Sequence, residues 1–72
     1  METQDDRYAI ISSTRLVQQL QIKKPMKVSE LLAQLGLAAS NYMVYSMEKQ
    51  RPLTQREAAT TNVKVFPIVA GG

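Results

Sequence analysis

The sequence has no cysteine and no histidine among its 72 residues. It therefore cannot supply a disulfide, a thiol nucleophile, an imidazole base or a Cys/His zinc cluster. Beyond the first six positions the only acids are Glu30, Glu48 and Glu57, which fall on separate predicted elements and give no paired-carboxylate site. We do not expect an enzyme. Without disulfides or a Cys/His metal site, the stability of so short a chain must come from hydrogen-bonded structure and close packing.

Long apolar runs are missing as well. None approaches the roughly 20 residues that a membrane-spanning helix requires, and no signal-peptide pattern opens the sequence. We therefore expect a cytoplasmic protein with no membrane partner. Apolar residues make up 44% of the chain and charged residues 21%, a composition that favours a folded domain over a disordered chain.

The net charge of +3 is unevenly distributed, because three of the six acids lie in the first six residues. From Arg7 onward nine bases stand against three acids, and Lys23, Lys24 and Lys27 gather in one predicted loop. Such a surface favours an acidic partner or a phosphate backbone. No RNA-binding motif or interleaved aromatic set accompanies these charges. We expect a solvated basic face and no nucleic-acid binding.

Alternation of apolar and polar residues predicts the strands. A hairpin is expected from two runs, 8–13 and 16–22, with a break at Thr14 and Arg15. Leu16, Gln18, Leu20 and Ile22 are predicted to share the apolar face of its second strand. Further strands are predicted at residues 42–47, which are apolar on both faces, and at residues 63–66. Met43, Tyr45 and Met47 are left open between core packing and an apolar surface.

Residues 28–35 change to a helical period, with apolar residues at the i, i+3, i+4, i+7 spacing of one face. Gly36 is placed to adopt the left-handed C-terminal cap, and Glu30 suits the positive end of the helix dipole. The first helical residue is less well defined, because Lys27 is a poor N-cap and Ser29 would be a good one.

A second, shorter helical element is predicted before the last strand. Thr54-Gln55-Arg56-Glu57 has the spacing of a capping box and could open one helical turn through Ala59. The element order then predicts a single α+β domain over residues 1–72, with one main helix packed on one face of a four-stranded sheet. Residues 1–7 are expected to fray and residues 67–72 to form a flexible tail.

The C-terminal segment has the most unusual composition, since two of the three glycines are the last two residues. Alternation places Lys64, Phe66 and Ile68 on the face away from the core, so Phe66 and Ile68 are predicted to form an exposed apolar patch. Pro67 cannot donate a ladder hydrogen bond. Sheet pairing is therefore expected to fail near Pro67 and to release residues 69–72 as an extended arm.

The ending Val63 to Gly72, VKVFPIVAGG, resembles the terminus of the ThiS and MoaD sulfur carriers, which belong with ubiquitin in the β-grasp superfamily. The run VSELL at residues 28–32 is similar to the helix opening common in ThiS-like proteins. The resemblance implies a β-grasp fold with a mixed sheet. It also implies that a partner enzyme adenylates the carboxylate of Gly72, and that sulfur then converts it to a thiocarboxylate for thiamin or molybdopterin biosynthesis.

The same resemblance assigns roles to the tail. Gly72 would carry the sulfur, and Gly71 would give clearance in a narrow channel. ATP and metal would be bound by the adenylating and sulfurtransferase partner, so this chain would bind no cofactor; a sulfur-accepting synthase is the second implied partner, and the chain alone is expected to be a monomer. The remaining residues implied in partner binding are Phe66 as docking anchor, Pro67, Ile68, Val69 and Ala70.

Two alternatives to a carrier remain open. A ubiquitin-like modifier would use the same adenylated Gly72 to form an isopeptide bond with a target lysine, whereas a non-catalytic β-grasp interaction module would use no chemistry at its glycines. Deletion of Gly71 and Gly72 separates the module from the other two. The sequence does not separate the thiamin pathway from the molybdopterin pathway.

Overall fold

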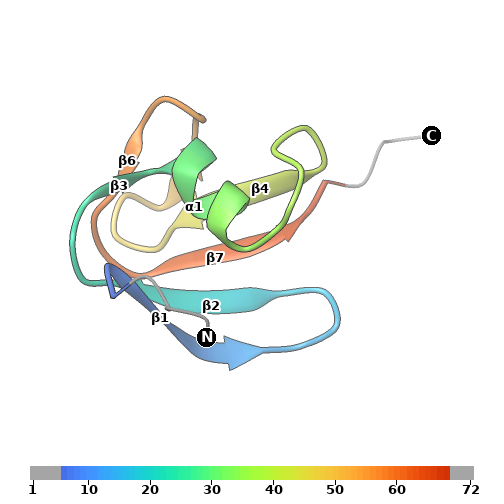
Figure 1. Ribbon diagram of the computed structural model, residues 1–72, viewed down its shortest axis with the longest axis horizontal. Helices are drawn as coiled ribbons and strands as arrows, with labels where there is room; N and C mark the ends of the chain where they lie inside the picture. The colour runs from blue at the N-terminus through green and yellow to red at the C-terminus, as the bar shows by residue number, and fades with distance from the viewer. Residues whose placement is uncertain (1–5, 69–72) are drawn as a thin grey trace.

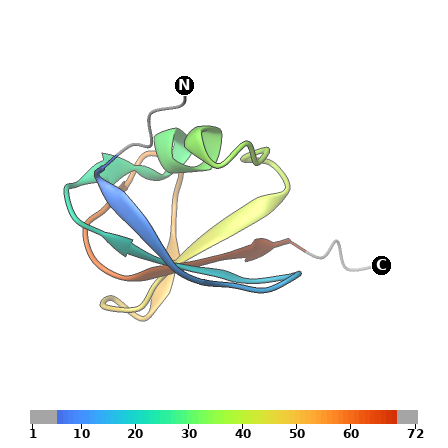
Figure 2. The same ribbon diagram turned by 60° about the horizontal axis from the view of Figure 1, so that its bottom comes forward.

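One helix packs against one face of a twisted sheet in the computed structural model, which describes residues 6–68 (Figures 1 and 2). This arrangement confirms the α+β class. The elements follow in the order β1 (Tyr8–Ser13), β2 (Gln18–Ile22), β3 (Met26–Lys27), α1 (Val28–Gln34), β4 (Tyr42–Ser46), β5 (Arg51–Leu53), β6 (Ala58–Ala59) and β7 (Val63–Pro67).

The main sheet has five strands in the order β1-β2-β7-β4-β5, and each of these pairings is antiparallel. The expected four-stranded mixed sheet is therefore wrong in strand number and in direction. Because β2 and β4 are both antiparallel to β7, they run in the same direction, and α1 connects them across one face as a split crossover. The last strand of the chain thus lies at the centre of the sheet.

The fifth strand, β5, was missed because its three residues include a proline and carry no alternation. Hairpin pairing with the preceding strand β4 creates it. Gln50 adopts a left-handed conformation, φ 57°, and its N–H donates to the Ser46 carbonyl at 2.8 Å, which turns the chain back along β4. Pro52 lies opposite Tyr45. The backbone groups of Tyr45 point toward β7, so the nitrogen of Pro52 points away from β4. Its missing N–H therefore leaves no gap in the pairing.

The helical turn predicted from Thr54 to Ala59 is also wrong. The Glu57 N–H donates to the Thr54 carbonyl at 3.1 Å and so closes a β-turn. The Thr54 N–H donates to Glu57 Oε1 at 2.8 Å, which is half of the capping box, but the chain then extends as β6. Pairing of β6 with β3, in a separate two-stranded sheet, takes precedence over the local helical signal.

The β1–β2 hairpin confirms the predicted hairpin, although its second strand begins at Gln18 and not at residue 16. Thr14 holds its turn, because its N–H donates to the Val17 carbonyl at 2.8 Å and its Oγ1 accepts the Val17 N–H at 3.0 Å. The register shifts between Ile10 and Ser12, so Ile11 is the extra residue of a β-bulge. Arg7 was expected to fray, but its carbonyl accepts the N–H groups of Lys23 and Lys24 at 2.7 and 3.1 Å.

Helix α1 ends as predicted, with Gly36 in the left-handed conformation at φ 74°. The Gly36 N–H donates to the Ala33 carbonyl, and the Leu37 N–H donates to the Leu32 carbonyl, the two bonds of a Schellman cap. Lys27 is the N-cap residue and makes no side-chain cap. The Val28 and Ser29 N–H groups instead donate to the carbonyls of Glu57 and Gln55, so the 54–57 turn caps the helix.

The core lies between α1 and the sheet. Val63 and Val65 are buried, as their alternation predicted, whereas Leu16 lies in the hairpin turn and is 64% exposed. Burial of each such aliphatic side chain contributes about 1.5–3 kcal/mol. The largest fully buried side chains are Leu20, Leu31, Leu32, Val28, Val44, Val63 and Val65.

Candidate functional site

The end of β7 lies at the margin of the sheet, past the end of β2. Gln18, the first residue of β2, lies opposite Val65, so Phe66 and Pro67 are accompanied only by β4. The ladder nevertheless continues, since the Ile68 N–H donates to the Asn41 carbonyl at 2.8 Å. Pairing therefore continues through Pro67 to Ile68, and the predicted release of residues 69–72 lies outside the described residues.

The tolerance of the sheet for Pro67 follows from hydrogen-bond alternation. The bond from Ile68 to Asn41 means that Phe66 and Ile68 direct their backbone groups toward β4. The nitrogen of Pro67 therefore points to the other side, where β2 has already ended. A proline at this position removes no ladder bond, so Pro67 belongs to the sheet and not to the segment that follows it.

The predicted apolar patch is present in part. Ile68 is 47% exposed, but Phe66 is half-buried rather than exposed. Phe66 lies opposite Met43, on the sheet face away from α1, because both alternate with buried core residues. We call the surface formed by Met43, Phe66 and Ile68 the tail-root surface. Tyr45 is likewise half-buried on this outer face.

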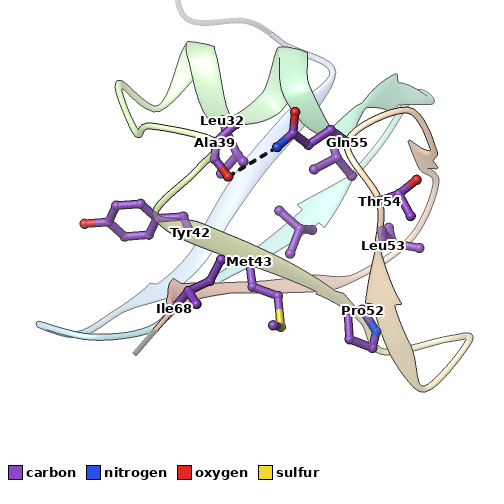
Figure 3. A pocket seen from close by; sticks show the side chains of 11 residues that line it. Leu32, Ala39, Tyr42, Met43, Pro52, Leu53, Thr54, Gln55 and Ile68 are labelled. Atoms are coloured by element: carbon purple, nitrogen blue, oxygen red, sulfur yellow. Dashed lines mark hydrogen bonds between the residues drawn. The ribbon is translucent and has the colours of Figure 1, made fainter. Parts of the chain in front are cut away.

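A half-open pocket of about 280 Å³ shares Met43 and Ile68 with the tail-root surface. Its floor is made by core side chains, and Met43, Pro52 and Ile68 lie along its lower side in Figure 3. Above it, Gln55 Nε2 donates to the Ala39 carbonyl at 3.4 Å. No single segment of the sequence predicts this pocket. The residues that line it are Val28, Leu32, Ala39, Tyr42, Met43, Val44, Pro52, Leu53, Thr54, Gln55 and Ile68.

The strand edge at this pocket is open over one stretch. Strand β5 ends at Leu53, opposite Val44, so Tyr42 extends past it. Since Asn41 and Met43 direct their backbone groups toward β7, alternation directs those of Tyr42 toward the pocket. An extended peptide could add to β4 at this point and place an apolar side chain in the pocket.

An ion pair fixes the turn that borders the pocket. The Arg51 guanidinium donates to both Glu57 carboxylate oxygens, at 2.9 and 2.6 Å. These bonds, together with the bond from the Thr54 N–H, lower the pKa of the Glu57 carboxyl to about 2. In turn, the hydrogen bonds to Glu57 and its negative charge raise the pKa of Arg51. A second surface pair joins Arg7 to Glu30 at 3.2 Å. Both ion pairs join separate segments of the fold.

The predicted site residues are only partly placed. Phe66, Pro67 and Ile68 come together at the end of β7. Val69, Ala70, Gly71 and Gly72 lie outside the described residues. Within residues 6–68, no group of three or more acidic side chains could hold a metal ion. In the same range no helix has the length and apolar character needed to cross a membrane.

Comparison with known proteins assigns no family. No family model matches the chain, and neither a curated protein nor a solved structure matches it.

Proposed function

We propose that this protein is a sulfur carrier of the ThiS/MoaD type, built on a β-grasp fold and charged at Gly72 by an adenylating partner. The supporting fold features are the split crossover of β2, α1 and β4, and the central place of β7. The strand directions depart from the mixed sheet that the resemblance implies. The family assignment therefore rests on the C-terminal sequence.

The position of the β7 end is the structural observation that supports the proposal. Ile68 is the last described residue, bound to Asn41 at the margin of the sheet, and Gly72 follows four positions later. An extended segment of that length reaches at most about 14 Å. A partner that activates Gly72 must therefore dock next to Ile68, where the tail-root surface offers apolar contact.

The chemistry needs only the carboxylate of Gly72 from this chain. A terminal carboxylate has a pKa of about 3.5 and is ionised at neutral pH, so it can attack the α-phosphate of ATP on the partner and release pyrophosphate. A partner persulfide then displaces AMP, and cleavage of its S–S bond by a reductant on the partner leaves the thiocarboxylate. This chain binds, presents and carries the group.

Intact mass of the protein isolated from its native cell tests the proposal. We expect a species heavier by the exchange of one oxygen for sulfur on Gly72, and its absence from the variant that lacks Gly71 and Gly72. Conjugates of higher mass would instead indicate that the protein is a ubiquitin-like modifier and not a sulfur carrier. A mature chain that extends past Gly72 untrimmed, or full cellular function of the truncated variant, would refute both.

A matched pair of variants tests the docking surface. Ile68→Asp should lower the thiocarboxylate fraction about tenfold, because a charge enters the centre of an apolar contact. Leu16→Asp introduces the same charge at a side chain that is 64% exposed and lies in the hairpin turn, so it should leave the fraction unchanged. Equal fractions in the two variants would show that the partner docks elsewhere.

A further inference from the structure

Strand β1 forms one margin of the sheet, with β2 as its neighbour on one side (Figure 1). It has six residues, Tyr8 to Ser13, with no charge and no proline. Ile10 and Ile11 are 49% and 52% exposed. Natural sheets protect their edges with short strands, charges, prolines or bulges, because an open edge pairs with other chains. Of these devices β1 has only the bulge at Ile11.

The opposite margin is protected along β5. Strand β5 has three residues and contains a charge, Arg51, and a proline, Pro52. Pro52 lies opposite Tyr45, whose backbone groups face β7, so the proline nitrogen faces the open side. The two margins therefore differ in whether they can accept another strand.

Alternation shows which groups of β1 are available. The Arg7 carbonyl accepts the Lys23 N–H, so the backbone groups of Arg7 point toward β2. By alternation those of Ala9, opposite Gln21, also point toward β2. Tyr8 and Ile10 then direct their backbone N–H and C=O groups to the open side. After the bulge at Ile11 the alternation shifts by one residue, so the backbone groups of Ser13 also point to the open side.

We propose that two copies of this chain pair antiparallel through β1, about a two-fold axis between Ile10 and Ile11. Tyr8 of one copy then lies opposite Ser13 of the other. Both residues lie on the same face, since their partners in β2, Ile22 and Gln18, are separated by an even number of positions. The bulge thus makes this register possible, because an unbulged strand would place Tyr8 and Ser13 on opposite faces.

Charges at the two ends of β1 complement each other in this register. At each end of the contact, Asp6 just before β1 of one copy comes near the hairpin turn of the other, which carries Arg15, and both side chains are exposed. A two-fold contact duplicates this pair and keeps its centre free of charge. Such self-complementarity argues for a second copy, rather than an unrelated partner, as the occupant of the edge.

The dimer should be weak. A contact of one short strand pair buries less than the roughly 800 Å² per partner of a stable interface. We expect a dissociation constant on the order of 100 µM, so the monomer expected from the sequence persists at low concentration. The proposal is independent of the chemistry at Gly72.

Sedimentation equilibrium of the full chain, from about 10 µM to about 1 mM, tests the dimer. Ile11→Lys should weaken association by about tenfold or more, because it sets two like charges beside the axis. Leu16→Lys adds the same charge in the hairpin turn, outside β1, and should change the dissociation constant less than about twofold. A monomer at every concentration, or equal effects of the two variants, would overturn the proposal.

A charge exchange tests the register. Asp6→Arg and Arg15→Asp should each weaken association by a few-fold, because each places like charges together. The chain with both substitutions should regain the original association, since the pairs are reversed but intact. Failure of the double variant to recover would refute this register.

The absence of native cysteine makes disulfide trapping clean. The register places Ala9 opposite Ser12 of the second copy, so an oxidised mixture of Ala9→Cys and Ser12→Cys chains should give the mixed disulfide. Neither variant should cross-link with itself, because like positions are offset along the strand. Self-linked products without the mixed one would contradict the proposed pairing.

Discussion

The two margins of the sheet are built differently. The β1–β2 margin is a local hairpin, closed within a few residues by Thr14 and held by a regular ladder. The β5 margin is also a local hairpin, with Arg51 opposite Ser46 of β4, but its strand is shorter. The 54–57 turn that follows it caps α1, and the Arg51–Glu57 ion pair fixes that turn. Both margins therefore have local backbone pairing, and the β5 margin depends in addition on the burial of Leu53 and on side-chain contacts.

The largest expected effect comes from removing burial at the β5 margin. Leu53 lies in β5, is 8% exposed and belongs to the core. Leu53→Ala should lower the free energy of unfolding by about 2–4 kcal/mol, through lost transfer energy and a cavity beside the pocket. Urea denaturation measures this change. Leu16→Ala, at the other margin, should lower the free energy of unfolding by less than about 0.5 kcal/mol. Similar losses in the two variants would show that the margins do not differ in buried packing.

A smaller effect of opposite sign is expected at the β1–β2 margin. Gln18 lies on the core-facing side of β2, opposite Val65, and its Oε1 is buried with no hydrogen-bond partner among the described residues. Gln18→Leu should raise the free energy of unfolding by about 1 kcal/mol, because it removes an unsatisfied acceptor at similar volume.

The control for that substitution is Gln21→Leu, on an exposed position of the same strand. It should leave the urea midpoint nearly unchanged. If Gln18→Leu destabilises the protein, its carbonyl has a hydrogen-bond partner in solution, and the two margins are more alike than their packing indicates.

The same contrast explains what could be predicted from the sequence. The hairpin, α1 and its Gly36 cap were predicted correctly because each signal lies within one short segment. The strand β5 and the β3–β6 pair were missed, because neither carries a local signal strong enough to oppose Pro52 or the capping box. The β3–β6 pair depends on segments distant in the sequence, whereas β5 pairs with the preceding strand β4 across a turn that no Gly or Asn marks in the sequence.

The site divides in the same way. Alternation correctly placed Val63 and Val65 in the core, and it placed Phe66 on the other face. It could not show that Phe66 is half-buried, because that depends on Met43 in the neighbouring strand. Sequence reasoning also assumed that a proline ends a ladder, whereas Pro67 sits where β2 has already ended. The pocket has no counterpart in any one segment.

The smallest expected effect is a pH dependence at the β5 margin. Hydrogen bonds from Arg51 hold the pKa of Glu57 at about 2, below its ordinary value of 4.5. A carboxyl group with a lowered pKa in the folded state stabilises the protein fully above its unfolded value, and this contribution is lost as the pH falls. The contribution of the pair should therefore be complete above about pH 4.5 and should disappear as the pH approaches 2.

Glu57→Gln isolates this contribution, because it retains the shape of the side chain and removes the charge. The urea midpoint of the wild-type protein should exceed that of Glu57→Gln above about pH 4.5, and the two should converge toward pH 2. The difference should be small, since both side chains contact solvent, and added salt should reduce it further. A difference independent of pH would show that the Thr54–Glu57 turn, and not the charge of Glu57, holds this margin together.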